Sequence, residues 1–186
     1  MVHYADIPGT IWFTGLSGAG KSTLVQALST WLTAQGVVHV VLDGDVIRRG
    51  LCQDLGFSEE DRTENLRRVR ALCALMQDAN ILTCVACITP MASQRQENRR
   101  HLTHYLEVFV DCALEICVER DPKGLYAQAI RGDIPQFTGI SAPFEPPQHA
   151  HLTLNTHTSD VEGCLGQLKD ILLKCGWIKP QEDHSP

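Results

Sequence analysis

TIWFTGLSGAGKST, residues 10–23, joins a short apolar run to a loop with the complete pattern G-x4-G-K-[ST]. Glycines let the backbone curl round phosphate groups, and the exposed N–H groups form an anion-binding nest with the positive end of the following helix. Lys21 can reach the β- and γ-phosphates of a nucleotide, and the Ser22 hydroxyl can ligate Mg²⁺. The pattern therefore predicts a nucleotide-binding loop between a buried strand at 10–14 and an amphipathic helix at 22–34.

Strands alternate with helices along the rest of the chain, as judged from apolar runs and from apolar residues at helical spacing. The expected strands span residues 10–14, 37–42, 81–88, 106–111 and 152–156. The expected helices span residues 22–34, 58–78, 94–104, 113–119 and 161–174. This order predicts an α/β fold, a P-loop NTPase-type parallel β-sheet flanked by helices on both faces.

The length of 186 residues predicts one domain, which we expect to span residues 1–178. Residues 120–147 carry Gly, Pro and few apolar side chains, so we expect a long excursion from the core there. We expect residues 179–186 to form a disordered tail. Ligands bind where parallel strands end, and the phosphate loop, Asp43-Gly44-Asp45 and Thr89-Pro90 all follow expected strands.

The composition argues against several classes of function. A net charge of −6 disfavours a nucleic-acid-binding surface, which needs a basic face. No apolar run approaches the roughly 20 residues of a membrane helix, and no basic segment followed by an apolar stretch opens the chain. We therefore expect a cytoplasmic protein without a nucleic-acid or membrane partner.

Eight cysteines are scattered through apolar segments. Cys84 and Cys87 have C-x-x-C spacing, but they lie within an expected strand, where residues three apart point to opposite faces. We interpret them as small buried hydrophobic side chains rather than metal ligands or a disulfide.

A phosphate-binding loop identifies the nucleotide but not the acceptor. The chain has no Asn-Lys-x-Asp motif of the kind that reads guanine, and a compact domain with an acidic pair after the second strand favours a kinase of small metabolites. Asp43 or Asp45 could accept a proton or a hydrogen bond from an attacking hydroxyl, and the other could hold the waters of Mg²⁺.

The acceptor is predicted to be an anion that carries a base. Arg48 and Arg62 flank Leu55-Gly56-Phe57, and Asn65 follows one helical turn after Arg62. Guanidinium groups bind oxyanions through two parallel hydrogen bonds, and an aromatic ring such as that of Phe57 can stack on a base.

Over about residues 8–156 the chain resembles the adenylylsulfate (APS) kinases. The motifs that carry the resemblance occur in the expected order: GLSGAGKST at 15–23, LDGD at 42–45, IR at 47–48, LGFS at 55–58, DR at 61–62, EN at 64–65 with RR at 67–68, RDPKGLY at 120–126 and FTGI at 137–140. The resemblance implies transfer of the γ-phosphoryl group of ATP, with Mg²⁺, to the 3′-hydroxyl of APS. The products would be 3′-phosphoadenylylsulfate (PAPS) and ADP.

The resemblance also implies a role for each matching residue, a lid at about 120–147 that excludes water, no tightly bound organic cofactor, and a homodimer. The residues implied in ATP binding are Gly15, Leu16, Ser17, Gly18, Ala19, Gly20, Lys21, Ser22 and Thr23. Those implied in APS binding are Asp43, Arg48, Phe57, Arg62, Asn65, Ile88, Lys123 and Phe137, with the two phenylalanines enclosing the adenine. The implied catalytic residues are Lys21, Asp43, Asp45 and Lys123, and the implied Mg²⁺ ligands are Ser22 and Asp45.

The sequence departs from the family pattern after the third strand and in the lid. Residues 89–92 read Thr-Pro-Met-Ala, where the family has Ser-Pro, an aromatic residue or His, and a basic residue. Ser141 stands where Asp is common. Two alternatives stay open, namely a kinase for a different small hydroxyl acceptor and a nucleotide-binding module without turnover. Retention of Lys21, Asp43 and Lys123 favours an active enzyme.

Overall fold

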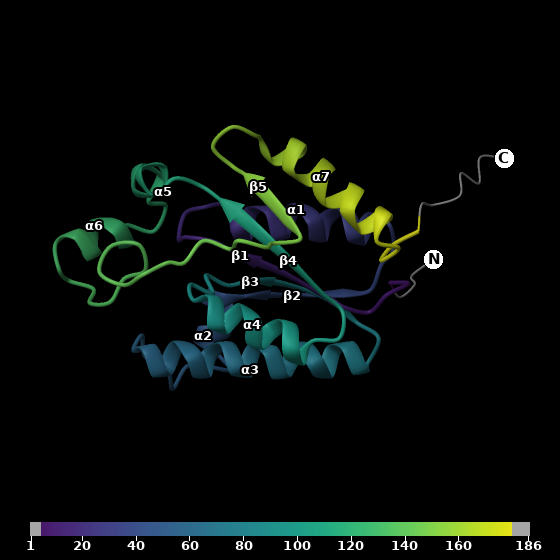
Figure 1. Ribbon diagram of the computed structural model, residues 1–186, viewed down its shortest axis with the longest axis horizontal. Coiled ribbons are helices and arrows are strands. Elements are labelled where there is room, and N and C mark those ends of the chain that lie inside the picture. Colours follow the sequence, from purple (N-terminus) through teal and green to yellow (C-terminus); the bar gives the residue numbers. More distant parts are fainter. Residues whose placement is uncertain (1–4, 180–186) are drawn as a thin grey trace.

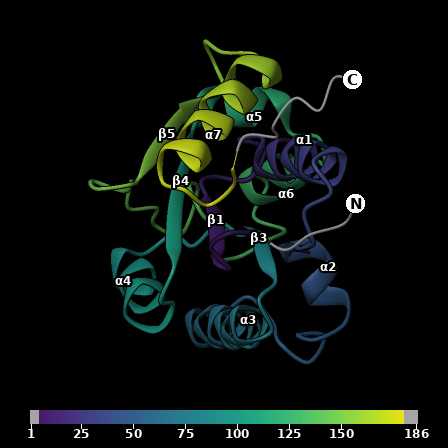
Figure 2. The same ribbon diagram turned by 90° about the vertical axis from the view of Figure 1, so that its right-hand side faces the viewer.

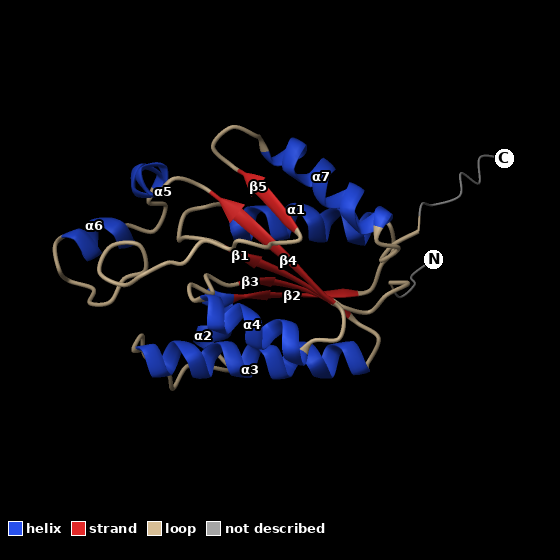
Figure 3. Ribbon diagram, in the orientation of Figure 1, coloured by secondary structure: helices blue, strands red, loops and turns tan. Residues whose placement is uncertain are grey.

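The fold is a five-stranded parallel sheet with helices on both faces, as a computed structural model that describes residues 5–179 shows (Figures 1 and 3). The strands are β1 (Thr10–Thr14), β2 (His39–Asp43), β3 (Leu82–Ala86), β4 (Tyr105–Asp111) and β5 (Leu152–Asn155), in the spatial order β2-β3-β1-β4-β5. The helices are α1 (Lys21–Ala34), α2 (Gly44–Arg49), α3 (Glu59–Asp78), α4 (Ala92–His101), α5 (Leu114–Arg120), α6 (Leu125–Ile130) and α7 (Val161–Lys174). The predicted α/β fold class is confirmed.

The two faces of the sheet bury separate apolar clusters. Side chains alternate along β1, so Ile11 and Phe13 pack into one cluster while Trp12 packs into the other. Figure 2 shows α1 and α7 over the first face and α3 and α4 over the second. Such two-sided burial explains why β1 and β3 consist of continuously buried residues.

The cysteine prediction is confirmed by the same alternation. Cys84 belongs to the cluster under α1 and α7, and Cys87 belongs to the cluster over α3 and α4. All eight cysteines are free thiols, and burial raises the pKa of the Cys84 and Cys87 thiols to about 12. Both residues therefore act as small hydrophobic groups.

The sequence missed two short helices and misplaced the ends of several elements. α2 and α6 have six residues each, too few to display a helical apolar period. The helix predicted at 94–104 begins instead at Ala92 and ends at His101. The start of α3 is as expected, because the Ser58 hydroxyl accepts a hydrogen bond from the Asp61 N–H at 3.1 Å.

The segment at 120–147 leaves the sheet after α5, forms α6, and returns along the end of the sheet to β5 (Figure 1). Most of the predicted tail, residues 180–186, lies outside the described residues, as do residues 1–4. Lys179 is described, and its ammonium group lies 2.9 Å from the Asp6 carboxylate. None of the helices within residues 5–179 is long and apolar enough to cross a membrane.

Candidate active site

The glycine-rich loop connects the end of β1 to the start of α1. Gly18 and Gly20 adopt left-handed backbone conformations with φ of 73° and 100°. A Cβ on Gly15, whose φ is 145°, would lie 2.5 Å from the Val110 carbonyl oxygen. No side chain of residues 5–179 caps the N-terminus of α1, so its first N–H groups point into the loop and can bind phosphate.

Lys21 is the cation of this loop. Its side chain is buried, and its ammonium group donates hydrogen bonds to the carbonyl oxygens of Gly15 at 2.9 Å and Leu16 at 2.6 Å. Burial disfavours the charged form and lowers the pKa of Lys21 to about 8. The two carbonyl partners of this ammonium group are neutral, and the phosphates of a bound nucleoside triphosphate would supply a negatively charged partner.

ATP affinity should therefore depend on pH through Lys21. Below about pH 8 the ammonium group is charged with or without ATP, so the Kd for ATP should be flat. Bound phosphates raise the Lys21 pKa, so above about pH 8 binding takes up one proton and the Kd should rise towards about tenfold per pH unit. Titration calorimetry from pH 7 to 9.5, in two buffers of different ionisation enthalpy, measures both effects.

Lys21→Arg is the matched control for this pH dependence, because a guanidinium group stays charged throughout the range. Its Kd for ATP should be independent of pH, whatever its absolute value. A wild-type Kd that stays constant up to pH 9.5, without proton uptake, would contradict the assignment.

The two aspartates after β2 have different partners. Asp43 is the last residue of β2 and the N-cap of α2, and its carboxylate accepts from the Asp45 N–H at 2.9 Å. Its other oxygen accepts from the Ser22 hydroxyl at 2.5 Å. Asp45 instead pairs with the ammonium group of Lys123, which comes from the segment at 120–147. The fold thus brings together the phosphate loop, the acidic pair and the segment at 120–147, the predicted lid.

This arrangement fits the magnesium ion of a bound nucleotide. No group of three or more His, Cys, Asp or Glu within residues 5–179 could hold a metal on its own. Mg²⁺ is usually bound through one or two protein ligands together with the phosphates of the substrate. The Ser22 hydroxyl and the nearby carboxylates are oxygen donors of the kind this ion prefers.

Three of the predicted acceptor residues, Arg48, Phe57 and Arg62, lie together beside α2 and α3. The Arg48 guanidinium carbon lies 4.4 Å from the centre of the Phe57 ring, and Arg48 also donates to the Gly56 carbonyl at 2.7 Å. Phe57 is 59% exposed even with Arg48 over its ring, so a ligand can reach this side chain. Asn65 is buried, and its side-chain oxygen has no hydrogen-bond partner within the described part of the chain. Buried polar atoms are rarely left without a partner, so Asn65 is a candidate for contact with a ligand.

Arg62 connects the acceptor side to the lid. Its guanidinium group donates to the Phe57 carbonyl at 2.9 Å, to the Thr138 hydroxyl at 2.5 Å and to the Gln136 carbonyl. Phe137 itself is buried and packs edge-to-face on Tyr126, with ring centres 5.0 Å apart. Arg62 thus contacts Phe57 as well as Gln136 and Thr138, the two neighbours of Phe137 in the chain. Enclosure of a base by Phe57 and Phe137 stays a prediction.

The remaining predicted residue, Ile88, follows β3. Its carbonyl oxygen accepts from the Gly15 N–H at 3.3 Å and from the Thr14 hydroxyl at 2.5 Å, so it adjoins the phosphate loop.

Contacts between the lid and the phosphate loop involve residues to which the sequence assigned no role. The Tyr126 hydroxyl donates to the Ser17 carbonyl at 3.0 Å. Arg120 donates to the Thr156 carbonyl at 2.7 Å, and the Thr156 hydroxyl donates to the Ala19 carbonyl at 2.8 Å. Tyr126 and Arg120 belong to the RDPKGLY motif, so this motif could have indicated a role for both residues.

A cavity of about 210 Å³ opens on the acceptor side. Arg62 and Gln136 line it together with Pro90 and Met91 from the loop after β3, and with Ser141 from the lid. Two of these residues, Met91 and Ser141, are departures from the family pattern. If this chain uses a different acceptor, we expect the residues that line this cavity to account for the change.

A phosphate loop, a serine–aspartate pair beside it and an anion-binding side joined by a lid define a P-loop phosphotransferase. The chain belongs to the adenylylsulfate kinase family, since the model of that family, described as adenylylsulphate kinase, matches residues 7–155. The resemblance inferred from the motifs is confirmed.

Curated relatives and a solved structure agree with the family model. The adenylyl-sulfate kinase of Shewanella sp. (strain ANA-3) is 48% identical over 94% of this chain and 86% of its own length. That of Marinobacter nauticus is 47% identical over 92% of this chain and 87% of its own. The Mycobacterium tuberculosis APS kinase, solved in complex with AMPPNP and APS, is 40% identical with a TM-score of 0.85, over 89% of this chain and 97% of that one.

Proposed function

We propose that this cleft transfers the γ-phosphoryl group of ATP, bound with Mg²⁺, to the 3′-hydroxyl of adenylylsulfate, giving 3′-phosphoadenylylsulfate and ADP. The observation that carries the proposal is the contact of the Asp43 carboxylate with Ser22 of the phosphate loop, beside an arginine-rich acceptor side. A general base next to the phosphoryl group and an anion-binding surface within reach of it are what this reaction needs.

On the nucleotide side, residues 15–23 hold ATP. The N–H groups at the start of α1 and the buried Lys21 ammonium group bind the β- and γ-phosphates. Ser22 and Asp45 serve the magnesium ion, Ser22 directly and Asp45 through its waters. Lys123, now paired with Asp45, would turn to the transferred phosphoryl group when the nucleotide binds.

Asp43 accepts the proton of the attacking hydroxyl. The 3′-oxygen forms a bond to the γ-phosphorus, the bond between that phosphorus and the β,γ-bridging oxygen breaks, and ADP leaves with the electron pair. The N–H of Asp45 and the hydroxyl of Ser22 hold the Asp43 carboxylate in place, which limits its rotation.

The acceptor lies between α2, α3 and the lid. Arg48 and Arg62 bind its sulfate and phosphate oxygens, and Asn65 supplies its unpartnered oxygen to a donor of the ligand. Phe57 and Phe137 enclose the adenine. Ile88, which lies beside Gly15, contacts the acceptor next to the phosphate loop. The lid at 120–147 excludes water, which would otherwise receive the phosphoryl group.

The test is a turnover assay with ATP and adenylylsulfate, read by mass spectrometry for 3′-phosphoadenylylsulfate, with a control that lacks the acceptor. We expect the product, with a kcat of about 1–100 s⁻¹, the usual range for kinases. Tight ATP binding without this product would overturn the proposal. Phosphorylation of another hydroxyl compound in its place would identify the paralogue that the departures at Met91 and Ser141 leave open.

The assembly and cellular location are further parts of the proposal. The resemblance implies a homodimer, which sedimentation velocity at micromolar concentration would detect. Eight free cysteines, seven of them buried, suit a reducing compartment such as the cytoplasm.

A further inference from the structure

A buried ion pair lies behind the acceptor side of the cleft. Arg95 of α4 is 3% exposed and Glu107 of β4 is 0% exposed, with the Arg95 Nε 3.9 Å from a Glu107 oxygen. Arg99 contacts the same oxygen at 3.0 Å, and the Tyr105 hydroxyl donates to the other oxygen at 3.1 Å. Two buried charges are costly to desolvate, so the pair is weak evidence for stability.

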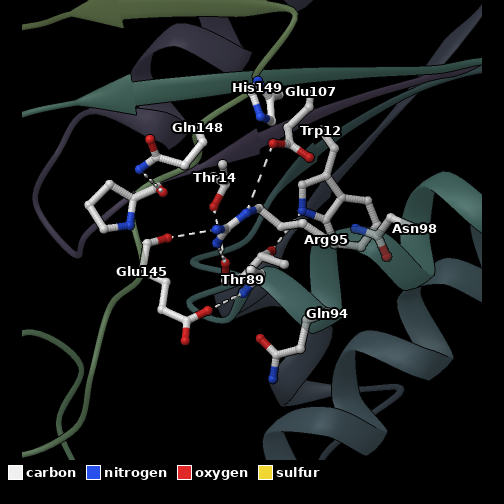
Figure 4. A network of polar contacts seen from close by, with 12 residues as sticks. Trp12, Thr14, Thr89, Gln94, Arg95, Asn98, Glu107, Glu145, Gln148 and His149 are labelled. Carbon is white, nitrogen blue, oxygen red and sulfur yellow. Dashed lines mark hydrogen bonds and ion pairs between the residues drawn. The ribbon is translucent and has the colours of Figure 1, made fainter.

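The guanidinium group of Arg95 joins two segments that border the cleft. Its Nη1 donates to the carbonyls of Thr89 at 2.9 Å and Pro90 at 3.2 Å, in the loop after β3. Its Nη2 donates to the carbonyl of Glu145 at 2.7 Å, where the lid returns to the core. Figure 4 shows Arg95 between Thr89 and Glu145, with a dashed line that joins it to Glu107.

The same two segments are tied by further contacts. The Glu145 N–H donates to the Pro90 carbonyl at 2.9 Å, and the Glu145 carboxylate accepts from the Ala92 N–H at 2.6 Å. The end of the lid and the loop after β3 therefore form one unit, which we call the Arg95 junction (residues 89–92, Arg95 and Glu145).

The backbone at this junction is strained. Thr89 is buried with a φ of 47°, a conformation that β-branched residues rarely adopt. Its hydroxyl accepts from the Trp12 indole N–H at 2.8 Å, and its carbonyl accepts from both Thr14 and Arg95. Strain persists only where the surroundings hold it, and it is frequent at functional sites.

The junction borders the acceptor side of the cleft, and it also contacts Thr14 at the end of β1. Pro90 and Met91 of the junction line the 210 Å³ cavity, together with Arg62 and Gln136. Arg95 itself contacts carbonyls and Glu107, and it does not line that cavity. Its effect on an acceptor must therefore pass through the position of the loop and of the lid.

We propose that Arg95 is a positioning residue that sets acceptor affinity, because it holds the loop after β3 and the end of the lid in the arrangement that binds adenylylsulfate. This inference rests on the proposed function for the identity of the acceptor. A shift of about 1 Å in such a wall can cost on the order of 10²-fold in activity. ATP binding, which depends on residues 15–23, should be spared.

The test compares Arg95→Lys with the wild type in steady-state kinetics. Lysine keeps a positive charge near Glu107 but cannot bridge three carbonyls with a fork. We expect the KM for adenylylsulfate to rise at least about tenfold and the KM for ATP to stay within about twofold. Arg100→Lys is the matched control, because Arg100 lies on the same helix, is exposed and pairs only with Glu97 within the described residues. Its kinetics should equal those of the wild type.

A second readout does not depend on turnover. Trypsin cleaves after Lys123 and Arg131 in the lid, and loss of the junction should speed this cleavage at least about fivefold in Arg95→Lys, with the melting temperature showing that the fold is intact. Arg95→Lys and Arg100→Lys leave the number of trypsin sites unchanged. A wild type that makes no product would refute the proposed function, while the proteolysis still decides the role of Arg95.

Glu145→Ala covers the case in which Arg95→Lys does not fold. Glu145 is exposed, and its carboxylate contributes to the junction through the Ala92 N–H alone among the described contacts. Faster lid cleavage with a selective rise in the KM for adenylylsulfate would support the inference. Equal changes in both KM values, or lid cleavage at the wild-type rate, would overturn it.

Discussion

Replacement of Lys21 by alanine should lower kcat/KM for ATP by at least about 10³-fold, which corresponds to about 4 kcal/mol of transition-state stabilisation. Lys21 is the buried cation of the phosphate loop, and its two carbonyl contacts aim it at the space where the phosphates bind. Alanine leaves the developing charge on the phosphoryl oxygens without this partner. The measurement is steady-state turnover with product detection by mass.

Lys174→Ala is the matched control, since Lys174 is exposed at the end of α7 on the periphery of the fold. It should retain wild-type kcat and KM. Circular dichroism should show that Lys21→Ala remains folded, because the substitution removes a charge whose burial is itself unfavourable. If Lys21→Ala kept a kcat/KM within tenfold of the wild type, the assigned role of Lys21 would be wrong.

The second large effect is expected for Asp43→Asn. An amide cannot accept the proton of the attacking hydroxyl, so kcat should fall by about 10²- to 10⁴-fold. Asparagine has one side-chain oxygen, which can still accept from the Asp45 N–H and cap α2, while its amide N–H can donate to the Ser22 hydroxyl oxygen, so α2 and the loop should keep their geometry. The Kd for ATP, measured by calorimetry without acceptor, should therefore stay within about threefold of the wild-type value.

Asp160→Asn makes the same chemical change at another helix cap. Asp160 accepts from the Gly163 N–H at 2.8 Å at the start of α7 and is exposed. This variant should show wild-type kcat, which separates the loss of a base from the loss of a capping carboxylate. Near-normal turnover of Asp43→Asn would assign the proton acceptor to another group.

The sequence was sufficient for the class of fold. The apolar run at 10–14, the glycine-rich loop and the alternation of strands with helices predicted the parallel sheet, because these signals are local in the chain. Local signals fail where an element is shorter than its period, as in α2 and α6. They also miss boundaries by a few residues, as at α4.

The sequence also proposed residues for the candidate site but not how they pair. It left the roles of Asp43 and Asp45 open at the level of residues, since both follow the same strand. The structure separates them: the Asp43 carboxylate contacts Ser22, and Asp45 pairs with Lys123 of the lid. Asp43 ends β2 and Asp45 lies in the first turn of α2, so their side chains meet different partners. The position of Lys123 depends on the path of a distant segment, which the spacing of the two aspartates does not encode.

The phosphate loop, the alternation of strands and helices along the chain and the set of candidate residues could thus be predicted from the sequence alone, because backbone freedom at glycine and apolar periodicity act over a few residues. The partners of Asp43 and Asp45, the burial that lowers the Lys21 pKa, and the Arg95 junction were decided only by the tertiary structure. Each depends on groups far apart in the chain, which meet only when the sheet and its helices have packed.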